Sequence, residues 1–93
     1  MQTHILSYRT IIEPVTNPKT GKTVYTAYSP KLGVSDWGKT IELALLHIQE
    51  AIECHLESLS KHHQPIPAPD QDEFLITTTR VNLNLGFKPT LAY

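Results

Sequence analysis

Residues 33–40, GVSDWGKT, match the G-x-x-x-x-G-K-[ST] pattern of a phosphate-binding loop. In such a loop, backbone N–H groups surround the phosphates, the lysine reaches the outer phosphates and the hydroxyl side chain holds magnesium. Gly33, Gly38, Lys39 and Thr40 occupy these positions here. Nucleotide binding is therefore the first chemical hypothesis to weigh.

The surrounding sequence argues against a nucleotide site. A phosphate-binding loop follows a buried parallel strand in a sheet with several crossovers, and a chain of 93 residues has little room for one. Pro30 precedes the motif where a central strand would need a backbone donor. Asp36 and Trp37 would place a negative charge and a bulky indole beside the phosphates. We therefore expect no cofactor.

Histidine and cysteine side chains are the other candidates for chemistry, because imidazole and thiolate are good metal ligands. Positions 47 and 54 lie about two turns apart on the expected helix, too far for a compact pair. His55 points about 100° away from Cys54, so no oriented nucleophile and base are predicted either. We expect no metal site and no enzyme activity. The candidate ligands weighed here are His47, Cys54, His55, His62 and His63.

Charge is unevenly distributed along the chain. Residues 1–41 hold five basic residues against two acids, residues 42–73 hold seven acids against one lysine, and residues 74–93 hold two basic residues. The net charge is −1. An acidic middle segment argues against nucleic-acid binding, which needs clustered Lys and Arg. It suits either a basic protein partner or an ordinary solvated helix face.

Chain length and composition predict a small soluble protein. A chain of 93 residues makes one domain with a limited core, so we expect a homodimer or larger assembly. Its single cysteine excludes an internal disulfide and suits the cytoplasm. Short apolar runs and an N-terminus unlike a signal peptide predict no membrane segment. We divide the chain into a core, residues 1–69, and a C-terminal strand extension of the same domain, residues 70–93.

Apolar periodicity predicts an α+β fold in the order β-β-β-α-β, with one amphipathic helix on one face of a small antiparallel sheet. Pro14 is expected to end the first strand. Thr40 is a good N-cap for a helix of about 20 residues. A proline-rich linker follows this helix and precedes a run of alternating apolar residues. The expected strands are residues 4–13, 23–28, 34–37 and 73–85.

The helix has two apolar faces of unequal size. The larger stripe, at three- and four-residue steps, should face the sheet. On the opposite face, two leucines flanked by glutamates form an apolar centre with an acidic rim, as expected of a site for a basic protein. The alternatives are an ordinary solvated face, or packing against the C-terminal strand or a second subunit. The stripe comprises Ile41, Ala44, Leu45, Ile48, Ala51, Ile52, Leu56 and Leu59, and the predicted partner contacts are Leu43, Leu46, His47 and Glu50.

These elements and their connecting motifs resemble the HicB-type antitoxin family over about residues 5–69. That family has a strand, a proline-containing turn, a Gly-x-Thr-x-x-Glu-Ala helix start, and a helix that ends before a proline-rich segment. The chain departs from the pattern at Lys31, where an acid is usual, at Leu43, where Glu is usual, and in a turn one residue shorter. The matching positions are Pro30, Leu32, Gly33, Ser35, Gly38, Thr40, Glu42 and Ala44.

The resemblance implies an antitoxin that binds and masks a small, basic, RNA-cleaving toxin of the HicA type. It also implies a fold similar to part of ribonuclease H, without nuclease activity, because the acids lie mostly on one helix and in the linker. The alternative is an orphan HicB-like dimeric adaptor or regulator with no toxin partner. Residues 81–93 have no helical periodicity and few charges, which argues against operator-DNA binding by this chain alone.

Overall fold

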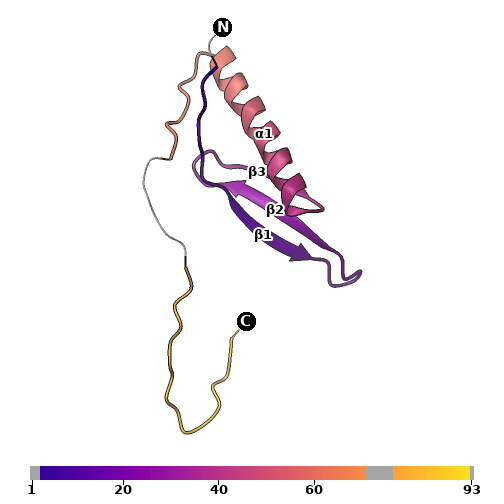
Figure 1. The fold of residues 1–93 in the computed structure, drawn as a ribbon, viewed down its shortest axis with the longest axis vertical. Helices are drawn as coiled ribbons and strands as arrows, with labels where there is room; N and C mark the ends of the chain where they lie inside the picture. The colour runs from indigo at the N-terminus through magenta and orange to yellow at the C-terminus, as the bar shows by residue number, and fades with distance from the viewer. Residues whose placement is uncertain (1–2, 71–76, 93) are drawn as a thin grey trace.

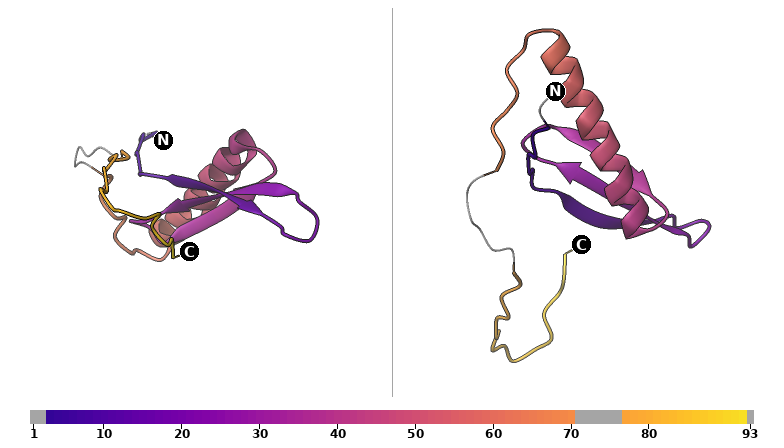
Figure 2. Two further views of the ribbon diagram at one scale, coloured as in Figure 1. Left: turned by 90° about the horizontal axis from the view of Figure 1, so that it is seen from below. Right: turned by 45° about the horizontal axis from the view of Figure 1, so that its top comes forward.

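Three antiparallel strands and one long helix form the fold in the computed structural model, which describes residues 3–70 and 77–92 (Figure 1). The strands lie side by side in the order β1-β2-β3, and the helix lies across one face of the sheet (Figure 2). This arrangement confirms the predicted α+β class. The elements are β1 (Ile11–Thr16), β2 (Thr23–Ser29), β3 (Val34–Gly38) and α1 (Ile41–Lys61).

The first strand begins and ends later than the sequence predicts. Residues 4–10 are extended without belonging to the sheet, and β1 continues through Pro14 to Thr16. Pro14 pairs with Tyr25 of β2, and β1 is an edge strand. A proline is tolerated at a sheet edge, because its missing N–H leaves no central ladder bond unmade. The prediction that Pro14 ends the strand was therefore wrong.

A tight turn over residues 30–33 joins β2 to β3. Gly33 has φ of +67°, a left-handed conformation that glycine adopts without steric cost. Its N–H donates a hydrogen bond to the Ser29 carbonyl at 2.9 Å. The Pro30, Leu32 and Gly33 positions of the family motif thus build the turn that reverses the chain into β3.

The helix packs on β2 and β3 through small side chains. Ala27 of β2 and Ala44 of α1 are fully buried, together with Ile48, and form the centre of the core. Gly38 at the end of β3 lies so close to the helix that a Cβ there would be 2.4 Å from the Ala44 backbone nitrogen. Small residues at these places let the helix backbone approach the sheet closely. Ile12 and Ile52 pack around this centre.

Thr40 caps α1 as the sequence predicts. Its backbone is extended, and its Oγ1 accepts a hydrogen bond from the Leu43 N–H at 3.1 Å. The first N–H groups of a helix have no partner within the helix, so this bond satisfies one of them. The helix then continues for 21 residues to Lys61.

Thr40→Ala is expected to lower the free energy of unfolding by about 1 kcal/mol, the usual cost of losing a side-chain N-cap. Urea denaturation followed by circular dichroism measures this change. Thr90 lies in the exposed run after residue 77, and Thr90→Ala serves as the control that should stay within about 0.5 kcal/mol of the parent. Equal stability of the two variants would contradict the capping role.

The further strand expected at residues 73–85 does not form over residues 77–85. Residues 73–76 lie outside the described part of the chain. Alternating apolar residues make a strand only where a neighbouring strand supplies hydrogen-bond partners, and none of the described strands lies alongside this run. The alternation is present without the pairing that would turn it into a strand.

Candidate protein-interaction site

The residues that match the phosphate-loop pattern include strand β3 and the N-cap of α1. Five of its residues form β3, and their backbone pairs with β2 in an antiparallel ladder. Gly38 is buried against α1, and Thr40 uses its hydroxyl to cap the helix. A phosphate needs several unpaired N–H groups pointing into one concave loop. The glycines and the threonine match the pattern because a turn, a close packing contact and a cap need these residue types.

The histidines and the cysteine do not gather into a metal site. Within residues 3–70 and 77–92, no three His, Cys, Asp or Glu side chains lie close enough to hold a metal ion. His62 instead places its Nδ1 2.7 Å from the Ser58 carbonyl at the end of α1. Cys54 is an exposed free thiol on the helix. In the described structure, His62 bonds within the end of α1, and Cys54 is a surface thiol.

His47 fastens the helix to β3. Its Nδ1 lies 2.6 Å from the Trp37 carbonyl, and it donates this bond in the tautomer that carries the proton on Nδ1. The Trp37 N–H in turn donates to the Asp36 carboxylate at 2.8 Å. Both backbone groups of Trp37 are therefore bonded to side chains. Another strand cannot pair with β3 at this residue without breaking these bonds.

The four predicted partner contacts differ in accessibility. Leu43 and Leu46 expose 39% and 48% of their surface, and Glu50 is also exposed. His47 is half-buried because of its bond to β3. The structure thus leaves two leucines and an acid available to a partner, while His47 has a structural role that the sequence does not reveal.

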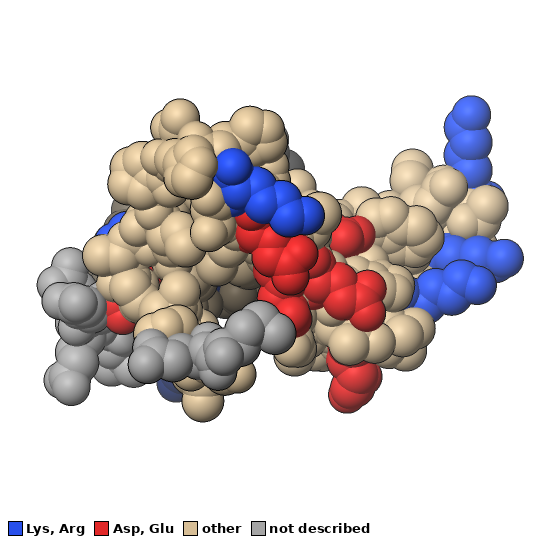
Figure 3. Space-filling model, turned by 90° about the horizontal axis from the view of Figure 1, so that it is seen from above, with Lys and Arg blue, Asp and Glu red and all other residues tan. Residues whose placement is uncertain are grey.

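Acidic side chains continue along α1 from these leucines. Glu42 and Glu50 lie one turn to either side of Leu46, Glu53 and Glu57 lie further along the helix, and all four are exposed. Figure 3 shows acidic side chains gathered in a band, well separated from most of the basic ones on that face. Exposed charges of one sign attract a partner of the opposite sign and speed its encounter. The helix surface has the composition expected of a site for a basic protein.

The sheet face away from α1 carries exposed aromatic residues that the sequence analysis missed. Trp37 and Tyr28 expose 54% and 44% of their surface, and Val15 is exposed toward the other end of β1, opposite Val24. The register places Tyr28 opposite Ser35 and Trp37 opposite Thr26, so this aromatic stripe spans β2 and β3. The signal was visible in β2, where apolar residues occupy both alternating sets of positions. A strand with apolar residues on both faces exposes one of them when a helix covers only the other, and α1 covers only one face of this sheet.

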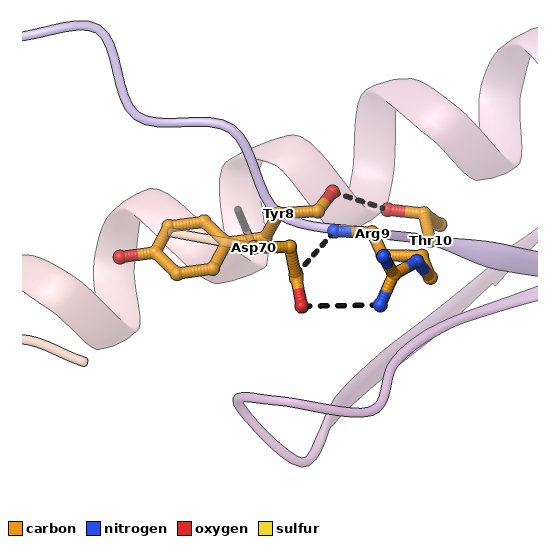
Figure 4. A network of polar contacts seen from close by, with 4 residues as sticks. All are labelled: Tyr8, Arg9, Thr10 and Asp70. Carbon is orange, nitrogen blue, oxygen red and sulfur yellow. Dashed lines mark hydrogen bonds and ion pairs between the residues drawn. The ribbon is translucent and has the colours of Figure 1, made fainter. Parts of the chain in front are cut away.

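The linker after α1 is fastened to the segment before β1 (Figure 4). The Arg9 N–H donates to Asp70 Oδ2 at 2.7 Å, and the Arg9 guanidinium lies 3.3 Å from Asp70 Oδ1. The Asp70 N–H donates to the Ser7 carbonyl at 3.2 Å, and the Tyr8 hydroxyl donates to the Pro67 carbonyl at 2.6 Å. These contacts join residues about sixty positions apart.

The same contacts shift two pKa values in opposite directions. The Arg9 backbone N–H, with smaller contributions from its side chain and from Lys31, lowers the pKa of the Asp70 carboxyl. Burial, and then the charge of Asp70, raise the pKa of the Tyr8 hydroxyl. Asp70 therefore stays ionised and Tyr8 stays protonated around neutral pH, which are the forms that these bonds need.

Two curated proteins resemble the chain. A UPF0150 protein of Synechocystis sp. is 47% identical over 47 residues, which cover 50% of this chain and 60% of that protein. A UPF0150 protein of Thermoplasma acidophilum is 40% identical over 53 residues, which cover 56% of this chain and 77% of the relative. The chain belongs to the UPF0150 family.

Other comparisons add nothing to this UPF0150 assignment. No family model matches the chain, and no solved structure is significantly similar to it. The matched part spans about three-fifths of the cyanobacterial UPF0150 protein, and the family name states no activity. Among the described residues, α1 is too polar to cross a bilayer as a helix.

Proposed function

We propose that this UPF0150 protein is an antitoxin of the HicB type, which binds a small, basic, RNA-cleaving toxin of the HicA type and masks it. The observation that supports the proposal best is the exposed face of α1, where Leu43 and Leu46 are exposed and Glu42 and Glu50 lie one turn to either side of Leu46. Desolvated apolar contacts provide affinity, and acidic rim residues favour a basic partner. We place this activity in the cytoplasm, where such a toxin would meet its RNA substrate.

The positions of the HicB-like motif residues also support the proposal. Gly33 makes the turn before β3, Gly38 allows α1 to approach the sheet, and Thr40 begins the helix. Ala44 fills the centre of the core. The motif therefore corresponds to the structural needs of a β-β-β-α unit whose outer helix face is left free for a partner.

Titrating a basic protein from an adjacent reading frame with this chain tests the proposal. The basic protein, of about 60 to 80 residues on a single-domain estimate, should cleave RNA by itself. We expect RNA cleavage to fall to background when the chain is added at about the same concentration as the basic protein. Inhibition should weaken as the salt concentration rises, because the contact is partly electrostatic. A monomeric acidic protein of similar size is the control. RNA cleavage that continues at excess chain would contradict the proposal.

A dimeric adaptor without a toxin partner remains the second candidate, favoured by the exposed aromatic stripe on the outer sheet face. Trp37 and Tyr28 form an exposed aromatic surface of the kind that marks protein contacts. The two candidates make different predictions in the same titration. An adaptor should leave RNA cleavage by the neighbouring protein unchanged at every ratio.

A further inference from the structure

A partly apolar groove of about 600 Å³ lies between residues 4–10 and α1. One wall includes Ile5 and Leu6, and the helix contributes Leu45, Ile52 and Leu56. Ile5 exposes 92% of its surface, and Leu45 exposes 43%. Apolar surface of this kind gains free energy when another apolar group displaces the water that covers it.

The C-terminal arm, residues 77–92, has a matching apolar face. Val81, Leu83 and Leu85 are exposed and alternate with the polar residues of the run. In an extended chain, alternate residues point to opposite sides, so the arm has one apolar and one polar side. Figure 1 shows the arm as the orange-to-yellow trace that extends beyond the sheet and the helix. It lines no part of the groove in its own chain.

The overall dimensions also show that the arm is not packed on its own domain. The radius of gyration is 18.8 Å, whereas a compact chain of this length has about 12 Å. The longest dimension of the molecule is 67 Å. An apolar arm of this reach is suited to contact another molecule.

The arm and the groove also differ in charge in a way that favours their contact. The arm contains Arg80 and Lys88 and no acid. The groove includes Glu53, on a helix with three further exposed glutamates. A basic amphipathic segment thus has a partly apolar groove, with a glutamate in its lining, available to it.

We propose that the C-terminal arm of one copy lies in this groove of a second copy, and that the exchange is reciprocal. The apolar side of the arm packs against the groove, and the polar side, which includes Arg80, faces away from it. Such an exchange uses the same two surfaces on each copy and closes as a two-fold dimer. It buries in the dimer the apolar side chains that each chain leaves in water. It does not use Leu43 or Leu46, so it is independent of the proposed toxin contact.

Disulfide trapping between two separately purified batches of the full chain tests this arrangement. Both batches carry Cys54→Ser, which removes the native thiol. One batch also carries Leu83→Cys in the arm, and the other carries Leu45→Cys in the groove. The matched control replaces the second batch with Leu46→Cys, because Leu46 is similarly exposed at 48% but does not line the groove. The batches are mixed, allowed to exchange and mildly oxidised.

We expect at least ten times more cross-linked heterodimer with Leu45→Cys than with Leu46→Cys, because a disulfide needs Cα atoms within about 7 Å. Light scattering should report a dimer for the parent and for each variant before oxidation. Equal trapping at the two positions, or trapping at neither, would overturn the proposal. A chain carrying both Leu83→Cys and Leu45→Cys that closes a disulfide while monomeric would show instead that the arm folds back onto its own groove, which also overturns it.

Discussion

Gly38→Ala is expected to lower the free energy of unfolding by about 3 kcal/mol, at the upper end of the usual cost of overpacking a core. A Cβ at this position would be 2.4 Å from the Ala44 nitrogen, 2.7 Å from the Leu43 carbonyl carbon and 2.9 Å from the Leu43 Cβ. Two of these atoms belong to the helix backbone. They cannot move aside like a flexible side chain, so α1 must shift away from β3.

Urea denaturation of the parent and of Gly38→Ala measures this loss, with circular dichroism as the signal. Gly86→Ala is the control, because a Cβ at Gly86 meets nothing within 4 Å. We expect the control to change stability by less than about 0.5 kcal/mol. Similar midpoints for the two variants would show that the close approach of α1 to β3 is not needed for folding.

The effect of this substitution also bears on the phosphate-loop pattern. If Gly38 served a bound phosphate, its replacement would change ligand binding more than stability. The structure gives it a packing role, since it is buried at the contact between β3 and α1. The sequence shows that position 38 is a glycine, and the neighbouring helix atoms show that a larger side chain would not fit there.

The helix and its cap could be predicted closely, because their signals are local. Thr40 precedes a long run with apolar residues at three- and four-residue spacing, and both the cap and the helix follow. The contact between His47 and the Trp37 carbonyl could not be predicted, because it depends on how α1 crosses β3. The same holds for the tether between Arg9 and Asp70, whose residues lie 61 positions apart.

Strand predictions were less accurate, because a strand depends on its neighbours as much as on its own residues. Pro14 was expected to end β1, but at an edge strand its missing donor is harmless. Residues 77–85 belong to the run with the cleanest alternation in the chain, and none of the described strands lies beside them. The arm-exchange proposal gives this pattern a physical role, since a second copy would cover its apolar side.

The predicted partner face was only partly recognisable from the sequence. Helical spacing brought Leu43, Leu46 and Glu50 to one side of α1, and these three are exposed in the structure. Spacing could not show that His47 would be held by β3. The outer sheet stripe around Trp37 was missed because β2 has apolar residues at both alternating sets of positions, and spacing alone does not show which set the helix covers.

Replacing Leu43 and Leu46 together with Lys is expected to weaken capture of the basic toxin at least tenfold, equivalent to about 1.4 kcal/mol. The double variant removes the two exposed leucines from the centre of the proposed contact. It also adds two positive charges among the glutamates of α1, which repel a basic partner. Titration of the purified toxin, followed by calorimetry, measures the change in affinity.

A charge-matched control separates the site from a general effect of added lysines. Val15→Lys with Ile66→Lys replaces two side chains of similar exposure, 48% and 42%, outside α1. Both double variants should keep the circular dichroism and the molecular mass of the parent, because all four side chains are substantially exposed. Only the helix variant should lose affinity for the toxin. Equal affinity of the two folded variants would remove Leu43 and Leu46 from the contact. Unfolding of the helix variant alone would show that this face of α1 stabilises the protein itself.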